Sequence, residues 1–243
     1  MLISVAIPTY NNARFLKETL NYIITDNRIS EIIMVDDCSN DNNKELIQEI
    51  IKPISKIKFY QNSKNLGVYP NKIKAVELCK NEWVILLDAD NIIEKNYIDV
   101  IFKENLQKDI IYAPEWARTF NNHKMDGYSH MLIYKEYGNQ IIDKKIALGN
   151  RNKAKFKCLM NTGNYLLHKN TFLNTMKNKP EYERSMSCID VFYANHKWLK
   201  DNKKIKVVKD LQYFHRLHSS STYMISTKSR ETHWNNFFFK NLE

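Results

Sequence analysis

Short apolar runs alternate with stretches of helical spacing through the first 91 residues of the chain. Four of these runs have the length and composition of buried strands: Ile3–Ile7, Ile32–Val35, Ile57–Tyr60 and Trp83–Leu87. Three segments between them have helical apolar spacing or helix-start signals: 13–24, 42–51 and 71–80. Strands and helices that alternate at short intervals predict an α/β fold with a mostly parallel sheet covered by helices on both faces.

The chain after residue 91 has a less regular pattern. It predicts a helix over 96–107, an extended segment over 110–113, a helix over 191–199, and two strands over 205–208 and 211–214. Residues 114–157 are polar, aromatic and weakly patterned, which is typical of a substrate site or a mobile lid. No internal repeat or linker divides the chain, so we expect a single domain over 1–243.

Two acids separated by one small residue follow the apolar run Trp83–Leu87. If the strand continues through them, Asp88 and Asp90 project to the same side and Ala89 turns away. Adjacent carboxylates repel unless a cation lies between them, and a divalent metal that carries a diphosphate would satisfy them. The alternative is a polar turn after a core strand.

Three further polar clusters accompany the predicted strands and helices. They are Pro8-Thr9-Tyr10-Asn11, Val35-Asp36-Asp37-Cys38-Ser39, and Asn65-Leu66-Gly67 with Lys72. The carboxyl ends of parallel strands line one edge of a sheet, so the first two clusters and the Asp88–Asp90 pair should converge on one crevice. Neither Gly-rich phosphate-binding motif, GxGxxG or Walker A, is present, so a nucleotide here must be held by side chains and a metal.

Composition narrows the class of partner and the compartment. The formal net charge is +10, but the basic residues are scattered along the chain without a nucleic-acid-binding motif, so we expect no nucleic acid partner. The four cysteines are far apart, which argues against a zinc ribbon or a disulfide framework and suits a reducing compartment. No signal peptide or membrane-spanning run is evident, so we expect a cytoplasmic protein, soluble or peripheral at the inner face of a membrane.

The ordered set of a strand ending in PTYN, a second ending in VDDCSND, NxG followed by a basic residue, and LDAD resembles the family 2 glycosyltransferases. The resemblance is continuous from Ser4 to Asn91 and returns in pieces to about Ser221. It implies a Rossmann-like GT-A fold with a nucleotide-binding half (1–91), a less regular donor-sugar and acceptor half (92–222), and an aromatic, basic tail (223–243).

The resemblance also implies an activity and its partners. A member of this family would be an inverting transferase that uses Mn²⁺ or Mg²⁺. It would move a sugar from a nucleotide-sugar donor, most readily a UDP-sugar, to a hydroxyl of a glycan, lipid-linked or protein acceptor. Polysaccharide biosynthesis is one setting for such a reaction.

Residue by residue, the resemblance assigns nucleotide contacts to eight positions: Pro8, Thr9, Tyr10, Asp36, Asp37, Lys72, Asp88 and Ala89. It assigns the metal to Asp90 and to His218, which lies in an Arg-x-His stretch followed by serines. The alternative roles are helix capping and turn formation for Asp36 and Asp37, and a solvated helix face for Lys72. His215 is interpreted as packing, and Arg216 as a residue that could pair with phosphate.

The catalytic base matches Asp190, although Ile189 stands where the family has Glu. Asp190 could instead cap its helix, and Glu181 and Glu183 are the reserve candidates for the base. Gly163 and Asn164 match the loop under the donor sugar and acceptor.

Three alternatives stay open at this stage. The departure at Ile189 suggests a nucleotide-sugar-binding protein without turnover. A nucleotidyltransferase is disfavoured by the lack of a Gly-rich phosphate-binding stretch. The tail could contact a membrane, close the core or form a dimer.

Overall fold

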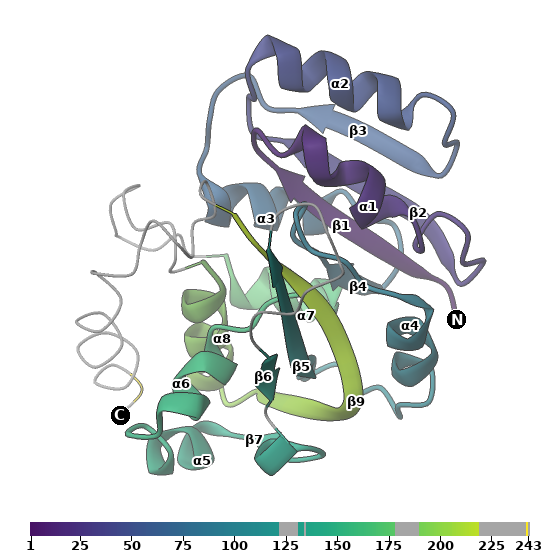
Figure 1. Ribbon diagram of the computed structural model, residues 1–243. Coiled ribbons are helices and arrows are strands. Elements are labelled where there is room, and N and C mark those ends of the chain that lie inside the picture. Colours follow the sequence, from purple (N-terminus) through teal and green to yellow (C-terminus); the bar gives the residue numbers. More distant parts are fainter. Residues whose placement is uncertain (122–130, 134, 178–189, 219–241, 243) are drawn as a thin grey trace.

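One mixed sheet forms the centre of the protein (Figure 1). The computed structural model describes residues 1–121, 131–133, 135–177, 190–218 and 242. Within these residues nine strands pair in the order β3-β2-β1-β4-β8-β5-β9-β7, with β6 beside β5. The strands are β1 (Ile3–Thr9), β2 (Ile29–Asp36), β3 (Ile57–Gln61), β4 (Trp83–Leu86), β5 (Ile110–Asn121), β6 (Met131–Ile133), β7 (Ile141–Ile142), β8 (Tyr165–His168) and β9 (Lys204–Leu217). Strands β1 to β5 and β9 share one direction, so the predicted mostly parallel sheet is confirmed.

Helices cover both faces of this sheet (Figure 1). They are η1 (Ala13–Phe15), α1 (Leu16–Leu20), α2 (Asp41–Ile51), α3 (Val68–Glu77), α4 (Lys95–Ile101), η2 (Lys135–Tyr137), α5 (Lys144–Gly149), α6 (Ala154–Met160), α7 (Lys169–Thr175) and α8 (Asp190–Lys200). Successive strand residues alternate between two cores. Val5 and Ile85 face the core that contains α1, α2 and α4, whereas Ala6 and Val84 face the core that contains α3, α6, α7 and α8.

The last strand differs from the prediction. Two strands were expected over 205–208 and 211–214, but β9 is continuous. Its pairing with β5 shifts between Pro114 and Trp116, and Asp210 takes the left-handed conformation with φ of 65°. The buried Glu115 carboxylate accepts the Asp210 amide at 2.9 Å. A bulge therefore absorbs the polar residues that interrupt the apolar pattern, and the strand continues beyond them.

Other boundaries also differ from the expected ones. The helix expected over 13–24 is η1 followed by the short α1, and the helix expected over 96–107 ends at Ile101. Residues 114–157 were expected to form a weakly patterned site or lid. Their described part contains the rest of β5, with β6, η2, β7, α5 and most of α6. Residues 122–130 and 134 lie outside the described residues.

Buried Glu31 connects three strands of the parallel half and supports a stability prediction. Its carboxylate accepts Ser4 Oγ at 2.8 Å, Lys58 Nζ at 3.0 Å and the backbone amide of Lys80. Burial raises the pKa of Glu31, but these hydrogen bonds outweigh it and hold the pKa below its usual value. The carboxylate thus stabilises the fold above its unfolded pKa of about 4.3, and this contribution is lost as the pH falls through the folded pKa.

We expect Glu31→Gln to lower the free energy of unfolding at pH 7 by about 2 kcal/mol, because donors of a buried carboxylate lose their charged acceptor. The deficit should shrink in acid, where wild-type Glu31 is itself protonated. Thermal unfolding at pH 7 and in acid measures the difference in stability between the variant and the wild type. The matched control is Glu82→Gln, an exposed carboxylate with a 3.6 Å contact to Lys108. Equal melting temperatures for the two variants at pH 7 would contradict the prediction.

Candidate active site

The carboxyl ends of β2, β1 and β4 lie side by side at one edge of the sheet (Figure 1). Thr9 pairs with Asp36 in register, and the Asp37 amide donates to the Thr9 carbonyl at 2.8 Å. On the other side of β1, the Leu87 amide donates to Ala6 at 2.9 Å. The polar clusters that follow β1, β2 and β4 therefore lie together, as the sequence predicted.

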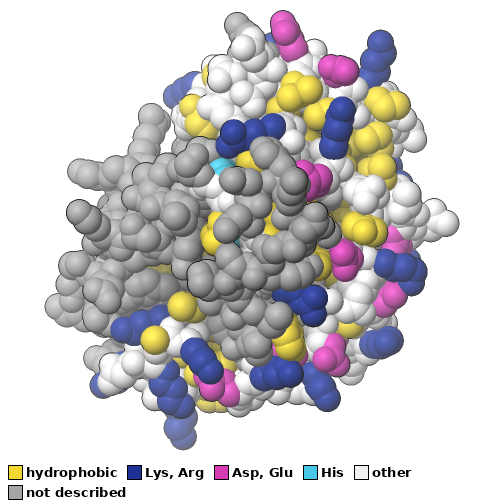
Figure 2. Space-filling model, viewed as in Figure 1, with side chains coloured by type: hydrophobic (Ala, Val, Ile, Leu, Met, Phe, Trp, Pro, Cys, Tyr) yellow, Lys and Arg dark blue, Asp and Glu magenta, His cyan; other side chains and the backbone are white. Residues whose placement is uncertain are grey.

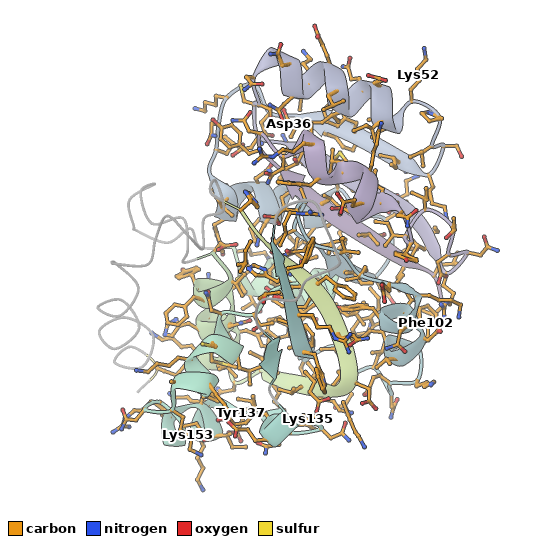
Figure 3. The ribbon with its side chains drawn as sticks, in the orientation of Figure 1. Asp36, Lys52, Phe102, Lys135, Tyr137 and Lys153 are labelled. Carbon is orange, nitrogen blue, oxygen red and sulfur yellow. The ribbon has the colours of Figure 1, made fainter. Side chains whose placement is uncertain are left out.

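Asp36 and Asp37 shape the loops around this edge (Figure 3, where Asp36 is labelled). The buried Asp36 carboxylate accepts the backbone amide of Ser39 at 3.0 Å and also the Ser39 hydroxyl. Asp37 accepts the amides of Leu66 and Gly67, each at 2.8 Å. Gly67 has a φ of 93°, which favours glycine in this turn. Both aspartates thus form turns, as the alternative interpretation expected, and any nucleotide contact they make adds to that role.

The end of β1 presents one buried hydroxyl and one exposed ring. Thr9 Oγ1 is buried and has no hydrogen-bond partner within the described residues. The neighbouring Tyr10 side chain is 48% exposed, and Pro8 is half-buried. A buried polar atom without a partner costs free energy, so Thr9 is a ready contact for a bound polar ligand.

The two acids of the DxD stretch lie on a turn rather than on a strand. Strand β4 ends at Leu86, and the Asn91 amide donates to the Asp88 carbonyl at 3.1 Å. Ala89 is buried, and its carbonyl accepts Thr19 Oγ1 at 2.9 Å. The expectation that strand alternation aligns Asp88 with Asp90 is therefore wrong. The turn holds Ala89 inward and lets the two carboxylates contact different partners.

Lys72 lies between two of the predicted site carboxylates. Its ammonium is 2.7 Å from Asp88 Oδ1 and 2.5 Å from Asp190 Oδ2, and its side chain is buried. Burial disfavours the charged ammonium, but the nearby Asp190 and Asp88 outweigh burial and raise the pKa of Lys72. Burial raises the pKa of Asp88, and the attraction of Lys72 opposes this. The alternative interpretation of Lys72 as a solvated helix residue is wrong, because it joins α3, the β4 turn and α8.

Asp90 pairs with His218 at the end of β9. His218 Nε2 is 3.1 Å from Asp90 Oδ2, and the imidazole packs on the Phe15 ring with centroids 4.7 Å apart. Burial raises the pKa of Asp90, but the hydrogen bond to His218 and the nearby histidines outweigh it and lower the pKa. The neighbouring His215 packs edge-on against Tyr213, as expected.

The Asp90–His218 pair fits a divalent cation that is shared with a ligand. The described residues contain no cluster of three or more His, Cys, Asp or Glu side chains able to hold a metal. Mg²⁺ is commonly held by one or two carboxylates together with phosphate oxygens and water, and Mn²⁺ also accepts carboxylate and water ligands. The Asp90 carboxylate, at the same edge as Thr9, belongs to such an incomplete donor set, and the His218 imidazole beside it would add a nitrogen donor.

Two predicted residues from the donor-sugar loop do lie at the site. A Cβ on Gly163 would come 3.1 Å from Val191 Cγ2 and 3.6 Å from Asp88 Oδ2. Asn164 has a φ of 58°, and its side-chain oxygen accepts the Asp88 amide at 2.8 Å. Asn164 therefore positions Asp88, and Gly163 lets the loop approach both the β4 turn and α8.

Arg216 was interpreted as a phosphate partner, and the structure gives it a different position. It is fully buried, its Nη2 is 2.9 Å from Glu18 Oε2, and its Nε donates to the Asp90 carbonyl at 3.1 Å. Its guanidinium also lies over the rings of Phe15 and Phe120. Arg216 therefore stabilises the turn that contains Asp88 and Asp90.

Three residues around the site were not singled out from the sequence: Glu18, Asn91 and Tyr97. Asn91 accepts the Arg216 amide at 3.1 Å, and Tyr97 donates its hydroxyl to the Asn164 carbonyl at 2.6 Å. The buried Asn91 directly follows the DxD acids, and this position was the one sequence signal that could have identified it.

Asp190 is the first residue of α8, and its carboxylate is directed to Lys72. The reserve bases Glu181 and Glu183 lie outside the described residues, as do Ile189 and the aromatic tail from 223 except for Leu242.

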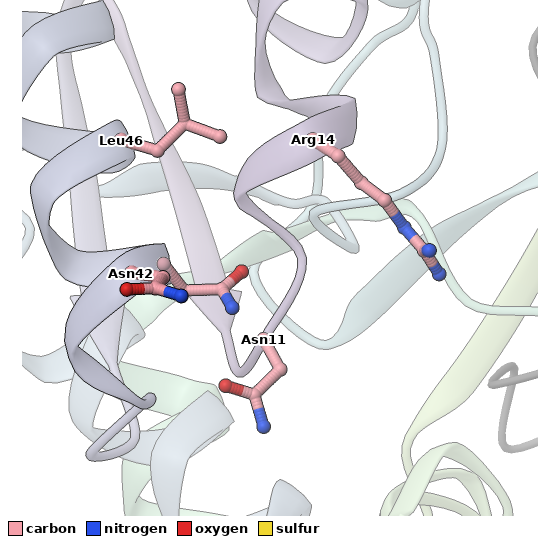
Figure 4. A pocket seen from close by; sticks show the side chains of 5 residues that line it. Asn11, Arg14, Asn42 and Leu46 are labelled. Carbon is pink, nitrogen blue, oxygen red and sulfur yellow. The ribbon is translucent and has the colours of Figure 1, made fainter.

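A separate cleft lies beside this site, between η1 and the first turns of α2 (Figure 4). It encloses about 390 Å³ and is lined by Asn11, Arg14, Asn42, Asn43 and Leu46. Asn11 forms its boundary with the site, because its amide donates to Ser39 Oγ at 2.8 Å. None of the predicted site residues lines the cleft.

Comparison with known proteins identifies the family. The model of "Glycosyl transferase family 2" matches residues 4–179, which is more than half of the chain. The chain belongs to glycosyl transferase family 2. The matched segment includes the strand ends of β1, β2 and β4, Lys72, and the Gly163–Asn164 loop. As a family 2 member, the chain is a glycosyltransferase domain.

Curated and solved relatives agree with this family. An uncharacterised glycosyltransferase of Mycoplasma genitalium (MG060) is 37% identical over 115 residues, 44% of this chain and 38% of that protein. The poly(ribitol-phosphate) β-N-acetylglucosaminyltransferase TarP of Staphylococcus aureus is 29% identical over 220 residues, 80% of this chain and 65% of that protein. The S. aureus TarS structure in complex with UDP-GlcNAc is 18% identical and has a TM-score of 0.63, covering 93% of this chain and 61% of that chain. The chain thus spans less than two thirds of each of these relatives.

Proposed function

We propose that this family 2 domain transfers a sugar from a UDP-sugar to a hydroxyl of a glycan acceptor, with inversion at the anomeric carbon. The observation that carries the proposal is the Lys72 bridge, which brings a carboxylate of α8 to the carboxyl end of β4. The proposed base on α8 thereby faces the edge of the sheet where the nucleotide is proposed to bind, at the carboxyl ends of β1, β2 and β4. The relatives support the donor class, since TarP is named as an N-acetylglucosaminyltransferase and TarS has been crystallised with UDP-GlcNAc.

Asp190 acts as the general base in this proposal. Its carboxylate takes the proton of the acceptor hydroxyl while that oxygen forms a bond to the anomeric carbon. The bond from the anomeric carbon to the diphosphate breaks, and its electron pair leaves with the diphosphate. Attack opposite to the leaving group inverts the configuration. Lys72 balances the charge of Asp190 and Asp88 before the donor binds.

Asp90 and His218 would hold Mn²⁺ or Mg²⁺ at the same edge. When bound, the cation offsets the negative charge that develops on the leaving diphosphate. Nucleotide contacts are assigned to Thr9, whose buried hydroxyl has no partner within the described residues, and to the exposed ring of Tyr10.

One observation favours a second function, nucleotide-sugar binding without turnover. The Asp190 carboxylate already pairs with the Lys72 ammonium at 2.5 Å, so one of its oxygens is occupied before an acceptor hydroxyl arrives. Under this second function the donor still binds at the same edge. Substitution of Asp190 separates the two functions and is taken up in the Discussion.

Ligand-induced thermal stabilisation tests the donor class. We expect UDP with Mn²⁺ to raise the melting temperature by roughly 5 to 10 °C at 100 times its Kd, because a ligand that binds only the folded state stabilises it by mass action. GDP, CMP and dTDP should give smaller shifts. The shift should require the metal and should disappear in Asp90→Ala.

The matched control is Asp201→Ala, which removes a half-exposed aspartate that pairs with Lys203 on the surface. This variant should keep the full UDP shift. If folded wild-type protein shows no shift with any nucleotide, the proposed function fails. If Asp90→Ala keeps the metal-dependent shift, the assignment of Asp90 fails.

A further inference from the structure

The carboxyl ends of β1, β2 and β3 carry a row of three polar residues. Thr9 pairs with Asp36 in register, and Asp36 pairs with Gln61. Side chains alternate between the two faces along each strand, so neighbours in register project to the same face of a parallel sheet. Thr9 and Asp36 are buried, whereas Gln61 is exposed. Gln61 is therefore the most accessible member of this row.

The carboxylates of Asp36 and Asp37 are occupied by contacts within the protein. Asp36 accepts hydrogen bonds from the amide and the hydroxyl of Ser39 and from Gln61 Nε2. Asp37 accepts three hydrogen bonds, each at 2.8 Å, from donors in residues 62–67. Asp36 is 0% exposed and Asp37 is 2% exposed. Little of either carboxylate is thus left to contact a nucleotide base.

Asp36 fixes the orientation of the Gln61 amide. An ionised carboxylate only accepts hydrogen bonds, so the NH2 group of Gln61 faces Asp36 and the side-chain carbonyl points away from it. Gln61 Nε2 donates to Asp36 Oδ2 at 3.0 Å, and within the described residues no hydrogen bond involves the Gln61 side-chain carbonyl. Turning the amide over would lose the hydrogen bond to Asp36. Gln61 therefore presents a carbonyl acceptor and one remaining N–H in a fixed arrangement.

An acceptor beside a donor complements the edge of a uracil ring. Uracil has an N–H donor at N3 between two carbonyl acceptors, whereas cytosine has an acceptor at N3 beside a donor amino group. A glutamine amide that is free to turn over can match either base. The Gln61 amide is held by Asp36 in one orientation, so its pattern of hydrogen bonds favours uracil over cytosine.

The spacing of the strands suits a single pyrimidine ring. Neighbouring strands lie about 4.8 Å apart, so the ends of β1 and β3 are separated by about 10 Å. Tyr10, whose side chain is 48% exposed, stands at the β1 end of this gap, and Gln61 stands at the β3 end. Ser39 connects the two ends, because its hydroxyl accepts the Asn11 amide at 2.8 Å and donates to Asp36.

The surface around the row has a mixed character. On the face shown in Figure 2, basic, acidic and hydrophobic side chains are interspersed over the end of the molecule formed by α2 and β3. Such a surface suits an uncharged base better than a phosphate. Neither this end nor any other described part contains a helix long and apolar enough to cross a membrane.

The order of the strands accommodates a whole nucleotide along the same edge. The sheet runs β3-β2-β1-β4, and the proposed cation site of Asp90 and His218 follows β4. A nucleotide whose base lies between β3 and β1 has its diphosphate on the β4 side, where the proposed cation would bind. The two ends of the ligand thus have separate and chemically different contacts.

We infer that the Gln61 side chain recognises the base of the donor nucleotide, accepting the N3–H of uracil at its carbonyl oxygen while Asp36 holds its NH2 group. The inference rests on the proposed function and names the residue that selects the base. A single neutral hydrogen bond of this kind should contribute about 3- to 10-fold to the affinity for UDP.

The test compares the Kd of UDP with that of CDP by titration calorimetry in the presence of Mn²⁺. Wild-type protein should bind UDP at least about tenfold more tightly than CDP, because the wrong base leaves polar groups unpaired. Gln61→Leu should weaken UDP binding by about 3- to 10-fold and change CDP binding much less. The matched control is Gln140→Leu, an exposed glutamine whose Nε2 donates to the Glu136 carbonyl at 2.8 Å, and it should keep the wild-type preference.

Two results in Gln61→Leu would overturn the inference. An equal loss of affinity for UDP and CDP would show that Gln61 acts only by holding the loop around Asp36. Unchanged affinity for UDP would show that the base is recognised elsewhere. Either result leaves the proposed function intact as long as wild-type protein binds UDP. Wild-type protein that binds neither nucleotide would reject the proposed function and the inference together.

Discussion

Asp190→Asn is expected to reduce sugar transfer by about 10³-fold while UDP binding is retained. The substitution removes the carboxylate proposed to take the acceptor proton and leaves a side chain of almost the same shape. Lys72 keeps its 2.7 Å contact with Asp88, so the buried ammonium is still paired. The rate of UDP release from a panel of UDP-sugars, with an acceptor present, measures transfer. The UDP thermal shift measures binding.

The control for this substitution is Asp201→Asn, just beyond the end of α8, which should keep wild-type activity. A wild-type protein that binds UDP and releases none from any UDP-sugar would support the function without turnover. An Asp190→Asn variant with undiminished transfer would assign the base elsewhere.

Lys72→Met is expected to destabilise the fold by about 2 to 4 kcal/mol, or roughly 5 to 15 °C in melting temperature. Removing the ammonium leaves two carboxylates without their counter-charge. The value lies at the low end for buried ion pairs because the Asp88 side chain is 29% exposed and water compensates part of its charge. Thermal unfolding measures the change, and Lys52→Met, an exposed lysine after α2, is the control.

A double-mutant cycle attributes the loss to the ion pair. Lys72→Met with Asp190→Asn should be at least about 1 kcal/mol more stable than the sum of the single changes predicts, because the second substitution removes one uncompensated charge. Additive losses would show that Lys72 stabilises the fold by packing alone.

Local patterns in the sequence predicted the parallel half of the fold well. Apolar runs placed β1, β2, β3 and β4, and turn residues placed the polar clusters at their ends. These features depend on neighbouring residues, which a single sequence displays directly.

The pairing within the site could not be predicted in the same way. Lys72 contacts Asp190 across 118 positions of the chain, and nothing in its local sequence marks it as buried. The strand-alternation argument failed for Asp88 and Asp90 because β4 ends at Leu86, and the turn that follows is held by a contact of Ala89 with Thr19, 70 positions away. Arg216 looked available for phosphate because its partner Glu18 lies far away in sequence.

The contact of Arg216 with Glu18 joins residues 198 positions apart, and it has a consequence for synthesis on the ribosome. Nascent chains fold from the N-terminus, and the β1 to β4 region can pair as soon as it leaves the exit tunnel. The contacts of Arg216 and His218 with Asp90, however, form only once β9 has emerged. Before β9 emerges, strands β1 to β4 can therefore be paired while the proposed cation site is still incomplete. The nascent domain acquires this proposed site only after β9 and His218 have been synthesised.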